Sequence, residues 1–390
     1  MRVTSTTMVY PQRETVDGVG DLPRLPGSTR ITSSSRSTGE EDTQFSESSA
    51  QTLQTGTSSR LLINEGIAYH RKGQYEKALK AFILALKSQR VDTNVDHPFL
   101  GNTLANIGST YLRQGKHLEA ERSLQEAMQM MRRLRDRCET QEEKSSFKLS
   151  GVLNNLGTVN FLQGDRKASL EYYREALKDA RTYGGSKKEI TNALHNIGRL
   201  SVLHQDWDTA ISVLNESLRM EKELYGKTAM PVVDTLNLIG FAHFSTEAYD
   251  AATVVFAEAL SIVHSNCGLV HEKVATSLLN VGMVLERQDR LEEALHTFST
   301  ARDVFERIGL ADTHRGADVA AASIAQIRAV LENDKEEEGS KPKLWTKKEG
   351  TKHQTPTQTK DQYAEYRDEP AHWQDDYSIV DSRDLDSSSS

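Results

Sequence analysis

The sequence predicts an all-α protein, built as a solenoid of six helix pairs followed by a capping helix. Three observations lead to this fold class. Segments of similar sequence recur at a nearly constant spacing, which is typical of repeat architectures. Within each segment, apolar residues follow helical spacing in two successive stretches. On either side of the repeated region, the composition changes to Ser/Thr-rich or highly charged sequence.

The repeats are recognised most easily by one glycine in each of six segments. The segments begin LINEGIAYHRKGQY, LANIGSTYLRQGKH, LNNLGTVNFLQGDR, LHNIGRLSVLHQDW, LNLIGFAHFSTEAY and LLNVGMVLERQDRL. Successive repeat glycines are 42, 49, 41, 42 and 42 residues apart, and they are Gly66, Gly108, Gly157, Gly198, Gly240 and Gly282. Spacing this regular predicts six copies of one structural unit.

A first helix is predicted around each repeat glycine. A leucine stands four residues before the glycine, and an aliphatic residue stands one before it in every segment except the first, which has Glu65. This spacing predicts an apolar stripe on one helix face. Glycine inside a helix costs roughly 1 kcal/mol relative to alanine. Its recurrence therefore predicts that a neighbouring helix approaches too closely for a side chain to fit.

A second helix is predicted in the later part of each segment. A small residue follows the repeat glycine by twelve positions, a large one by sixteen and a small one by nineteen. Spacings of four and three place these columns on one helix face, where small and large residues interlock with the facing helix. The large residues are Phe82, Leu124, Tyr173, Leu214, Phe256 and Phe298.

These columns resemble the tetratricopeptide repeat over roughly residues 59–310. The resemblance implies a right-handed superhelix whose first helices line a concave groove. The period of about 42 residues exceeds the family's usual period of about 34. Because of this period and the asparagine two positions before the glycine, the sequence is most similar to the kinesin-light-chain subtype.

The sequence departs from the family pattern where a proline usually ends the second helix. That column holds Arg90, Arg132, Arg181, Lys222, His264 and Glu306. Because these residues can continue a helix, the second helices are expected to run up to about two turns longer. Later glycines suit left-handed helix caps, namely Gly184, Gly226, Gly268 and Gly309. The 49-residue step predicts a longer helix and loop between repeats two and three.

Three regions are predicted along the chain. Residues 59–332 form the repeat array with its capping helix, which is predicted from the Ala-rich run RGADVAAASIAQIRAVLEND. Residues 1–58, with formal charge −2, and residues 333–390, with formal charge −5, are predicted to be disordered. Neither flank has enough apolar sequence to offset the entropy lost on ordering.

Several classes of function are excluded by the composition. The total formal charge is −8, which leaves about −1 for the array and argues against nucleic-acid binding. Two cysteines without CxxC spacing indicate neither a disulfide framework nor a zinc site. No membrane-spanning stretch, phosphate-binding loop or catalytic motif is present. We therefore expect a cytoplasmic protein without cofactor, metal or small-molecule substrate, and without enzymatic activity.

Binding residues are predicted on the first helices. The column two positions before the repeat glycine faces the groove by the resemblance. Five of its six residues are asparagine: Asn64, Asn106, Asn155, Asn196 and Asn280. An amide donates and accepts hydrogen bonds, so this series could hold the backbone of an extended peptide. The alternative is that these side chains only connect neighbouring helices and fix the repeat geometry.

Basic residues accompany this series. Arg71, Arg113 and Arg287 lie five positions after their glycines, and Arg199 and His195 lie close to Gly198. With large apolar neighbours, they suit a peptide that combines acidic residues with apolar anchors. Solvated surface arginines are the alternative. Family members that clamp a terminal carboxylate use Lys and Asn where this chain has Ile63 and Ile67, which disfavours that mode of binding.

The C-terminal flank contains one further candidate. Kinesin-light-chain-like grooves take peptides that have a tryptophan next to acidic residues. This resemblance makes Trp373, Asp375 and Asp376 candidates for a segment that folds back and blocks the groove. The alternative is a solvated tail.

The sequence thus predicts a protein-interaction adaptor whose groove binds an extended segment of a partner protein. Two other functions stay open at this point. The array could be a structural assembly subunit that uses its convex face or ends, or a regulatory protein that senses a small ligand. The sequence does not predict the partner or the oligomeric state.

Overall fold

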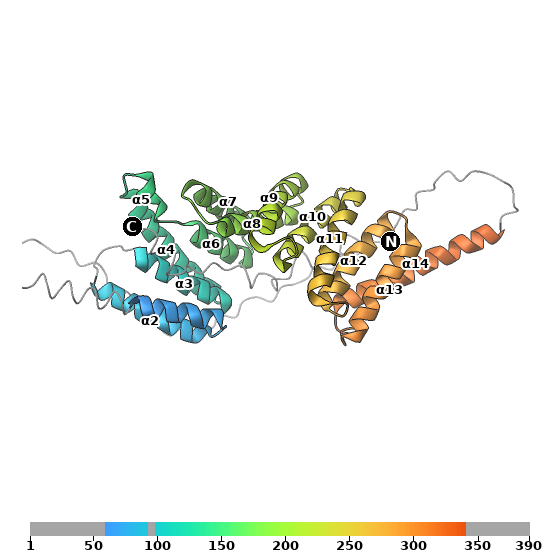
Figure 1. The fold of residues 1–390 in the computed structure, drawn as a ribbon, viewed down its shortest axis with the longest axis horizontal. Helices are drawn as coiled ribbons and strands as arrows, with labels where there is room; N and C mark the ends of the chain where they lie inside the picture. The colour runs from blue at the N-terminus through green and yellow to red at the C-terminus, as the bar shows by residue number, and fades with distance from the viewer. Residues whose placement is uncertain (1–58, 93–97, 341–390) are drawn as a thin grey trace, which may run out of the picture. The chain divides into compact units, whose positions relative to one another are not determined.

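The part of the chain that the structure describes forms helices and no strands. The structure is a computed structural model, and it describes residues 59–92 and 98–340. The first helix covers residues 59–71, and the others carry the labels of Figure 1: α2 (Tyr75–Asp92), α3 (Pro98–Arg113), α4 (His117–Asp136), α5 (Gln141–Ser145), α6 (Ser150–Leu162), α7 (Arg166–Thr182), α8 (Lys187–Leu203), α9 (Trp207–Tyr225), α10 (Met230–Ser245), α11 (Tyr249–Cys267), α12 (Glu272–Arg287), α13 (Leu291–Arg307) and α14 (Arg315–Ser340).

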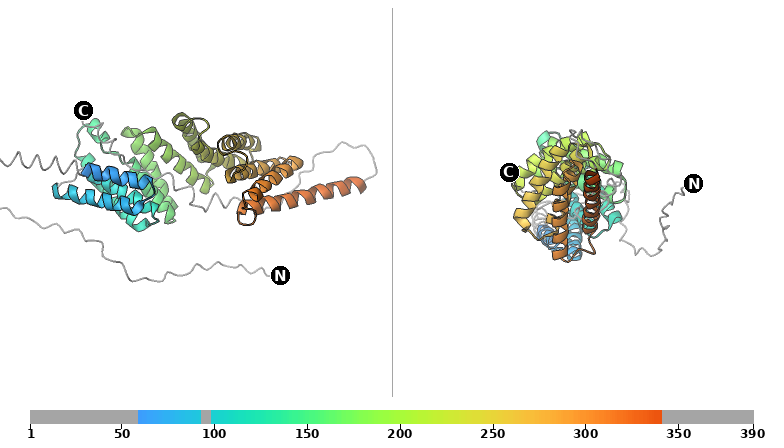
Figure 2. Two further views of the ribbon diagram at one scale, coloured as in Figure 1. Left: turned by 60° about the horizontal axis from the view of Figure 1, so that its bottom comes forward. Right: turned by 90° about the vertical axis from the view of Figure 1, so that its right-hand side faces the viewer.

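Consecutive helices pair into six repeats. Repeat 1 consists of the helix at residues 59–71 and α2, and repeats 2 to 6 consist of α3 with α4, α6 with α7, α8 with α9, α10 with α11, and α12 with α13. The second helix of each repeat also packs against the first helix of the next, as the views in Figures 1 and 2 show. The predicted solenoid of helix pairs is therefore confirmed.

The last repeat is covered by the predicted capping helix. This helix, α14, packs against both α12 and α13 and buries Ala317, Ala320, Ile324 and Ile327. It continues to Ser340, past the boundary predicted at residue 332. The Ala-rich run allows a close fit to the last helix pair because small side chains let helices approach each other.

The repeat glycines lie where the two helices of a repeat approach most closely. A Cβ atom at each of them would lie less than 3.0 Å from the large residue sixteen positions later, for example 2.4 Å from Leu214 at Gly198. Each of these large residues is at most 1% exposed. The close approach expected from the sequence is confirmed, and its partner is the second helix of the same repeat.

The turn between the two helices requires a left-handed residue in every repeat. Glycine supplies it in the first three repeats, as at Gly164 with φ of 89°. In the last three repeats the same position holds Gln205, Glu247 and Asp289, with φ between 59° and 61°. At the other helix end, Gly226 caps α9 with φ of 96° and ψ of 155°, so the positive φ expected of this glycine is found but the backbone is not left-handed helical. The second helices reach 17 to 20 residues, as expected without the proline.

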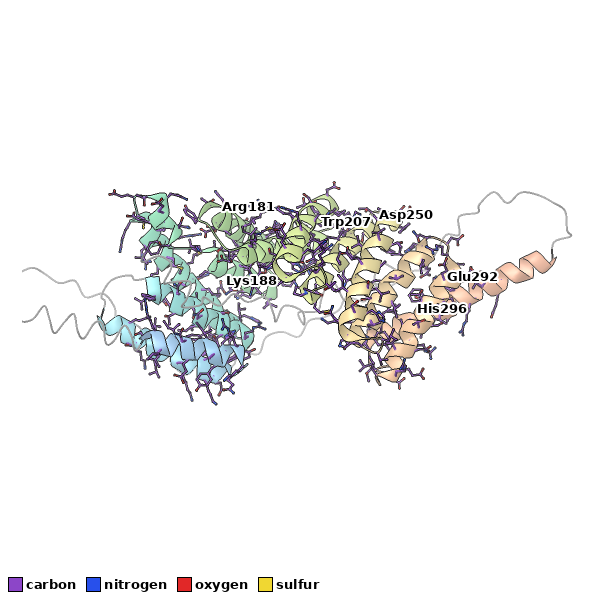
Figure 3. The ribbon with its side chains drawn as sticks, viewed as in Figure 1. Arg181, Lys188, Trp207, Asp250, Glu292 and His296 are labelled. Atoms are coloured by element: carbon purple, nitrogen blue, oxygen red, sulfur yellow. The ribbon has the colours of Figure 1, made fainter. Side chains whose placement is uncertain are left out.

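An ion pair recurs between the second helices of neighbouring repeats. A basic residue 24 positions after one repeat glycine meets a glutamate 18 positions after the next. The pairs are Arg132–Glu175 at 2.5 Å, Arg181–Glu216 at 2.7 Å and Lys222–Glu258 at 2.7 Å. Arg181 is labelled in Figure 3, as are Trp207, Asp250 and Glu292 at the start of the second helices of repeats 4 to 6. The column that replaces the family's proline therefore links repeat 2 to 3, repeat 3 to 4 and repeat 4 to 5.

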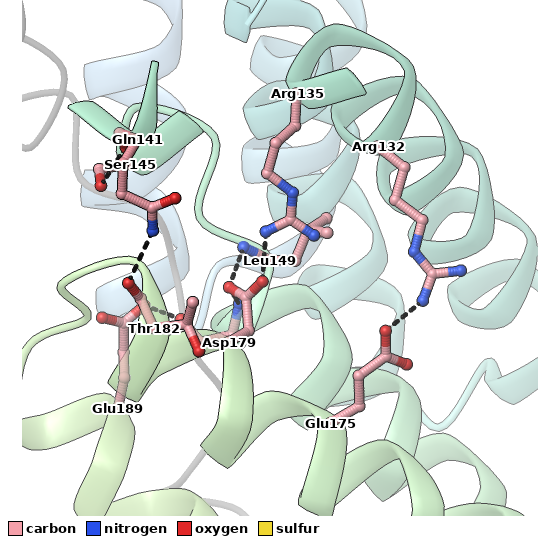
Figure 4. Close-up of polar contacts among 10 residues, drawn as sticks. Arg132, Arg135, Gln141, Ser145, Leu149, Glu175, Asp179, Thr182 and Glu189 are labelled. Carbon is pink, nitrogen blue, oxygen red and sulfur yellow. Dashed lines mark hydrogen bonds and ion pairs between the residues drawn. The ribbon is translucent and has the colours of Figure 1, made fainter. Parts of the chain in front are cut away.

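The longer connection between repeats 2 and 3 contains the short helix α5 and is fixed by a buried carboxylate (Figure 4). Asp179 Oδ2 on α7 accepts hydrogen bonds from the backbone N–H groups of Leu149 at 2.8 Å and Ser150 at 3.0 Å. Its Oδ1 pairs with the Arg135 guanidinium, which also lies 4.3 Å from the ring centroid of Tyr183. The side chain of Leu149, the N-cap residue of α6, accepts no hydrogen bond from the backbone N–H groups at this helix end. The carboxylate of Asp179 on α7 therefore caps α6.

Candidate functional site

The asparagine column lies between neighbouring first helices. Asn64, in the repeat that no other precedes in the described array, is exposed. Its counterparts are at most 2% exposed, and they are Asn106, Asn155, Asn196 and Asn280. First helices contact one another along the array, α3 with α6, α6 with α8 and α8 with α10. The column thus follows the line along which first helices adjoin.

Two of these asparagines bond to the repeat before them. Asn196 Nδ2 donates to Asn154 Oδ1 at 3.0 Å, and Asn280 Nδ2 donates to Asn237 Oδ1 at 3.4 Å. Both acceptors lie three positions before their own repeat glycine. These bonds connect neighbouring first helices, as the structural interpretation of the asparagine column requires, so Asn196 and Asn280 contribute to repeat geometry. A peptide-binding role for the whole column stays a proposal.

Arg71, Arg113 and Arg287 are the last residues of their first helices, whereas Arg199 and His195 lie further inside α8, so the predicted basic residues do not form one cluster. Arg199 donates to Asn196 Oδ1 at 3.3 Å, which joins it to the asparagine pair of repeats 3 and 4. Arg287 lies 5.9 Å from the ring centroid of Phe244 in the repeat before. Arg113 and Arg287 are half-buried, whereas Arg71 is exposed. The structure thus places guanidinium groups in repeats 1, 2, 4 and 6, with repeats 3 and 5 between them.

His195 belongs to a buried network rather than to an exposed surface. Thr235 donates its hydroxyl to Glu221 Oε1 at 2.8 Å, so the His195 Nδ1 2.9 Å away donates to Thr235. Ser217 donates to the same Glu221 oxygen at 2.9 Å. The network connects α8, α9 and α10. It was not predicted from the sequence, because Glu221 and Thr235 become neighbours only when repeats 4 and 5 stack.

Aromatic residues at the start of the second helices pack onto the first helices. Trp207 meets Phe241 edge-to-face at 5.9 Å between ring centroids, and Tyr249 meets Phe244 at 5.6 Å. Ile63 and Ile67, at the positions of the carboxylate clamp, are each 3% exposed. These residues therefore serve packing.

A buried histidine between repeats 1 and 2 makes stability depend on pH. Burial, together with Arg113 and Arg71, lowers the pKa of His70 to about 4. Thr110 donates to the Asn106 carbonyl, so the neutral His70 Nδ1–H donates to Thr110 Oγ1 at 3.0 Å. Because the unfolded chain binds this proton near pH 6.5 and the folded chain only near pH 4, stability falls as the pH falls between these values.

We expect this linkage to remove about 1–2 kcal/mol of stability between pH 7 and pH 5. Urea unfolding followed by circular dichroism at both pH values measures it. In His70→Gln the difference between the two pH values should shrink, whereas His296→Gln, at an exposed position labelled in Figure 3, should leave it unchanged. An equal pH dependence in all three proteins would contradict the assignment.

Three of the predicted site residues fall outside the part of the chain that the structure describes. Trp373, Asp375 and Asp376 lie outside the described residues, as do the flanks 1–58 and 341–390. Within residues 59–92 and 98–340, no cluster of His, Cys, Asp and Glu could hold a metal ion. In the same residues, no helix is long and apolar enough to cross a membrane.

Comparison with solved structures places the fold among repeat arrays. A signal-transduction ATPase with a tetratricopeptide-repeat sensor from Pyrococcus horikoshii superposes with a TM-score of 0.54 at 15% identity, over 69% of this chain and 38% of that one. The Pseudomonas aeruginosa protein pilF gives a TM-score of 0.50 at 16% identity, over 69% of this chain and 99% of its own. At this identity, the similarity concerns the fold alone.

Curated relatives are distant and longer. The kinesin light chain-related protein 3 of Arabidopsis thaliana is 20% identical over 231 residues, 59% of this chain and 34% of that protein. The CTR9 homolog of the same plant is 27% identical over 216 residues, 54% of this chain and 17% of that protein. The chain thus spans about a third or less of the length of these relatives.

The family model of the tetratricopeptide repeat matches three stretches of the sequence. They cover residues 57–133, 149–223 and 231–307, which together exceed half of the chain. Each stretch contains two of the six helix pairs seen in the structure. The chain belongs to the tetratricopeptide-repeat family.

Proposed function

We propose that this protein is a non-catalytic adaptor, located in the cytoplasm, whose first helices bind an extended segment of a partner protein. The observation that carries the proposal is the line of polar side chains along adjoining first helices. Asn154, Asn196 and Arg199 form a continuous hydrogen-bonded series across repeats 3 and 4. Guanidinium groups that recur along such a line suit the carboxylates of a bound peptide, while the buried amides of Asn196 and Asn280 hold the adjoining helices together.

The chemistry of the bound segment follows from the residues near the line. Guanidinium groups at Arg71, Arg113, Arg199 and Arg287 favour acidic side chains, because an ionised pair strengthens the hydrogen bond. Phe161, Leu162 and Leu203 are partly buried. Large apolar side chains of the segment could therefore pack against them and contribute most of the binding energy.

The sharpest test varies the arginines, since the asparagines also fix repeat geometry. A library of random twelve-residue peptides is displayed and selected on the full-length protein. We expect enrichment of peptides with acidic and large apolar residues. Arg113→Ala, Arg199→Ala and Arg287→Ala together should weaken the binding of these peptides at least about tenfold, because each charged hydrogen bond contributes about 1.5–3 kcal/mol.

The matched control changes three exposed arginines on the second helices of the same repeats. Arg122→Ala, Arg219→Ala and Arg302→Ala together should leave the affinity unchanged. Circular dichroism checks that both triple variants are folded. If the control variant loses binding and the first-helix variant keeps it, the second helices form the binding surface. The protein would then fit the alternative of a structural assembly subunit.

A further inference from the structure

Two columns of the repeat contact the second helix of the preceding repeat, the first column in repeats 2 and 5 and the second in repeats 3, 4 and 5. The residue five positions before the repeat glycine makes the first contact. Thr103 Oγ1 donates to Gln89 Oε1 at 3.2 Å, and Thr235 Oγ1 donates to Glu221 Oε1 at 2.8 Å. Both acceptors lie 23 positions after their own repeat glycine. This column therefore faces the preceding repeat.

The glutamate of the recurring ion pair makes the second contact. It stands 18 positions after the repeat glycine in repeats 3, 4 and 5 and meets a basic residue 24 positions after the preceding glycine. Positions 23 and 24 are consecutive on one second helix. The two columns therefore lie on one end face of a repeat, within reach of a single neighbouring helix.

In repeat 1 both columns hold leucine and are exposed. Leu61 occupies the first column and is 65% exposed, and Leu84 occupies the second and is 52% exposed. Ile83 beside it is 37% exposed. No helix of the described array precedes repeat 1. We call Leu61, Ile83 and Leu84 the leucine end face. At this end the chain replaces the glutamate of later repeats with an apolar residue.

Basic residues surround this end face. Lys77 and Lys80 lie seven and four residues before Leu84 on α2, and Lys87 lies three residues after it; all three are exposed, and these helical spacings place them on the same side of the helix as Leu84. Residues 59–89 contain six basic and two acidic residues, a formal charge of +4. The rest of the array, residues 90–332, then carries −5. The leucine end face thus favours an occupant that is both apolar and acidic.

The two ends of the array differ in whether apolar residues are exposed on the end face. At the other end α14 covers repeat 6, and its outward residues are charged or small, among them Asp318, Ala322, Ala325 and Arg328. Terminal repeats need such a polar outer side to stay soluble. A second copy placed on the leucine end face would bring two lysine-rich surfaces together, which opposes pairing of identical copies.

We propose that residues 361–390 of this chain bind the leucine end face. This segment contains nine acidic and two basic residues, a formal charge of −7, and it includes Trp373, Tyr377 and Ile379. Its charge is opposite to that of repeat 1, and its large apolar residues match the exposed leucines.

A photocrosslinker placed in the segment tests the proposal in the full-length chain. Trp373 is replaced by p-benzoylphenylalanine, the protein is irradiated, and the linked peptides are identified by mass spectrometry. We expect crosslinks to the helix at residues 59–71 and to α2. Leu61→Glu combined with Leu84→Glu should lower their yield at least about tenfold, because two apolar contacts are lost and the segment is acidic.

A matched control changes an equally exposed apolar residue elsewhere on the array. Val254→Glu on α11, where the valine is 69% exposed, should leave the crosslink yield unchanged. Lys80→Glu combined with Lys87→Glu tests the electrostatic contribution separately and should also lower the crosslink yield. Crosslinks to α6, α8 or α10 would overturn the proposal in favour of a tail bound along the first helices. A yield unchanged by both double variants, or the absence of crosslinks to the array, would overturn it as well.

Discussion

Replacement of Asp179 by alanine should destabilise repeats 2 and 3 by about 3–5 kcal/mol. Asp179 is 5% exposed, and one of its oxygens accepts from two backbone N–H groups that begin α6. The other oxygen pairs with Arg135, whose side chain is 13% exposed. The alanine variant leaves a guanidinium and two N–H donors with no acceptor in this buried place. Chemical unfolding followed by circular dichroism measures the loss.

Two further substitutions separate the causes of this loss. Glu175→Ala removes the exposed pair with Arg132 one turn earlier on α7 and should cost less than about 1 kcal/mol, as surface ion pairs do. Asp179→Asn keeps an acceptor for the backbone but loses the charge, so its effect should lie between the two. If Asp179→Ala proved no more harmful than Glu175→Ala, the carboxylate would not be the element that joins these repeats.

Replacement of Gly157 by leucine should destabilise the array by about 2–3 kcal/mol or more. A Cβ atom at Gly157 would lie 2.6 Å from the Tyr173 ring. That ring is fully buried, and its hydroxyl is bonded to Thr158 at 3.0 Å. Because the ring cannot move aside, the added side chain must push α6 and α7 apart. The gain in helix propensity over glycine, about 1 kcal/mol, is smaller than this cost.

A double-mutant cycle with Tyr173→Ala shows whether the contact is the cause. Tyr173→Ala alone should cost about 3–5 kcal/mol through the cavity that it leaves. With both changes present, the leucine fills part of that space, and the total loss should be smaller than the sum by about 1–2 kcal/mol. Additive losses would show that Gly157 is required for another reason.

The packing of each helix pair could be predicted from the sequence because it depends on residues within one repeat. The repeat glycine and the large residue sixteen positions later are the two partners of one contact between the helices of a repeat, as Gly198 and Leu214 are. Even the exception at Glu65 is explained. Its column is filled by buried or partly buried aliphatic residues in the later repeats, whereas Glu65 is exposed in the repeat that no other described repeat precedes.

Contacts between repeats could not be predicted to the same extent. The columns of basic residues and glutamates are visible in the sequence, but their pairing depends on how far one second helix is shifted against the next. Asn196 finds its partner in Asn154 for the same reason. The role of Asp179 depends on the path of the extra residues around α5, which no repeat pattern describes. Among the candidate site residues, the sequence therefore located the helix positions, whereas their partners required the structure.

The capping helix makes the two ends of the array unequal in stability, which sets the order in which the repeats unfold. In a one-dimensional array, each repeat is stabilised by its own packing and by its interfaces with its neighbours. Among the helices that the structure describes, repeat 6 has an interface on both sides because α14 supplies the second, whereas repeat 1 has an interface only with repeat 2. Opening should therefore start at the N-terminal repeat and advance toward α14. Partial unfolding of this protein is therefore expected to be vectorial, with intermediates that retain the repeats next to α14.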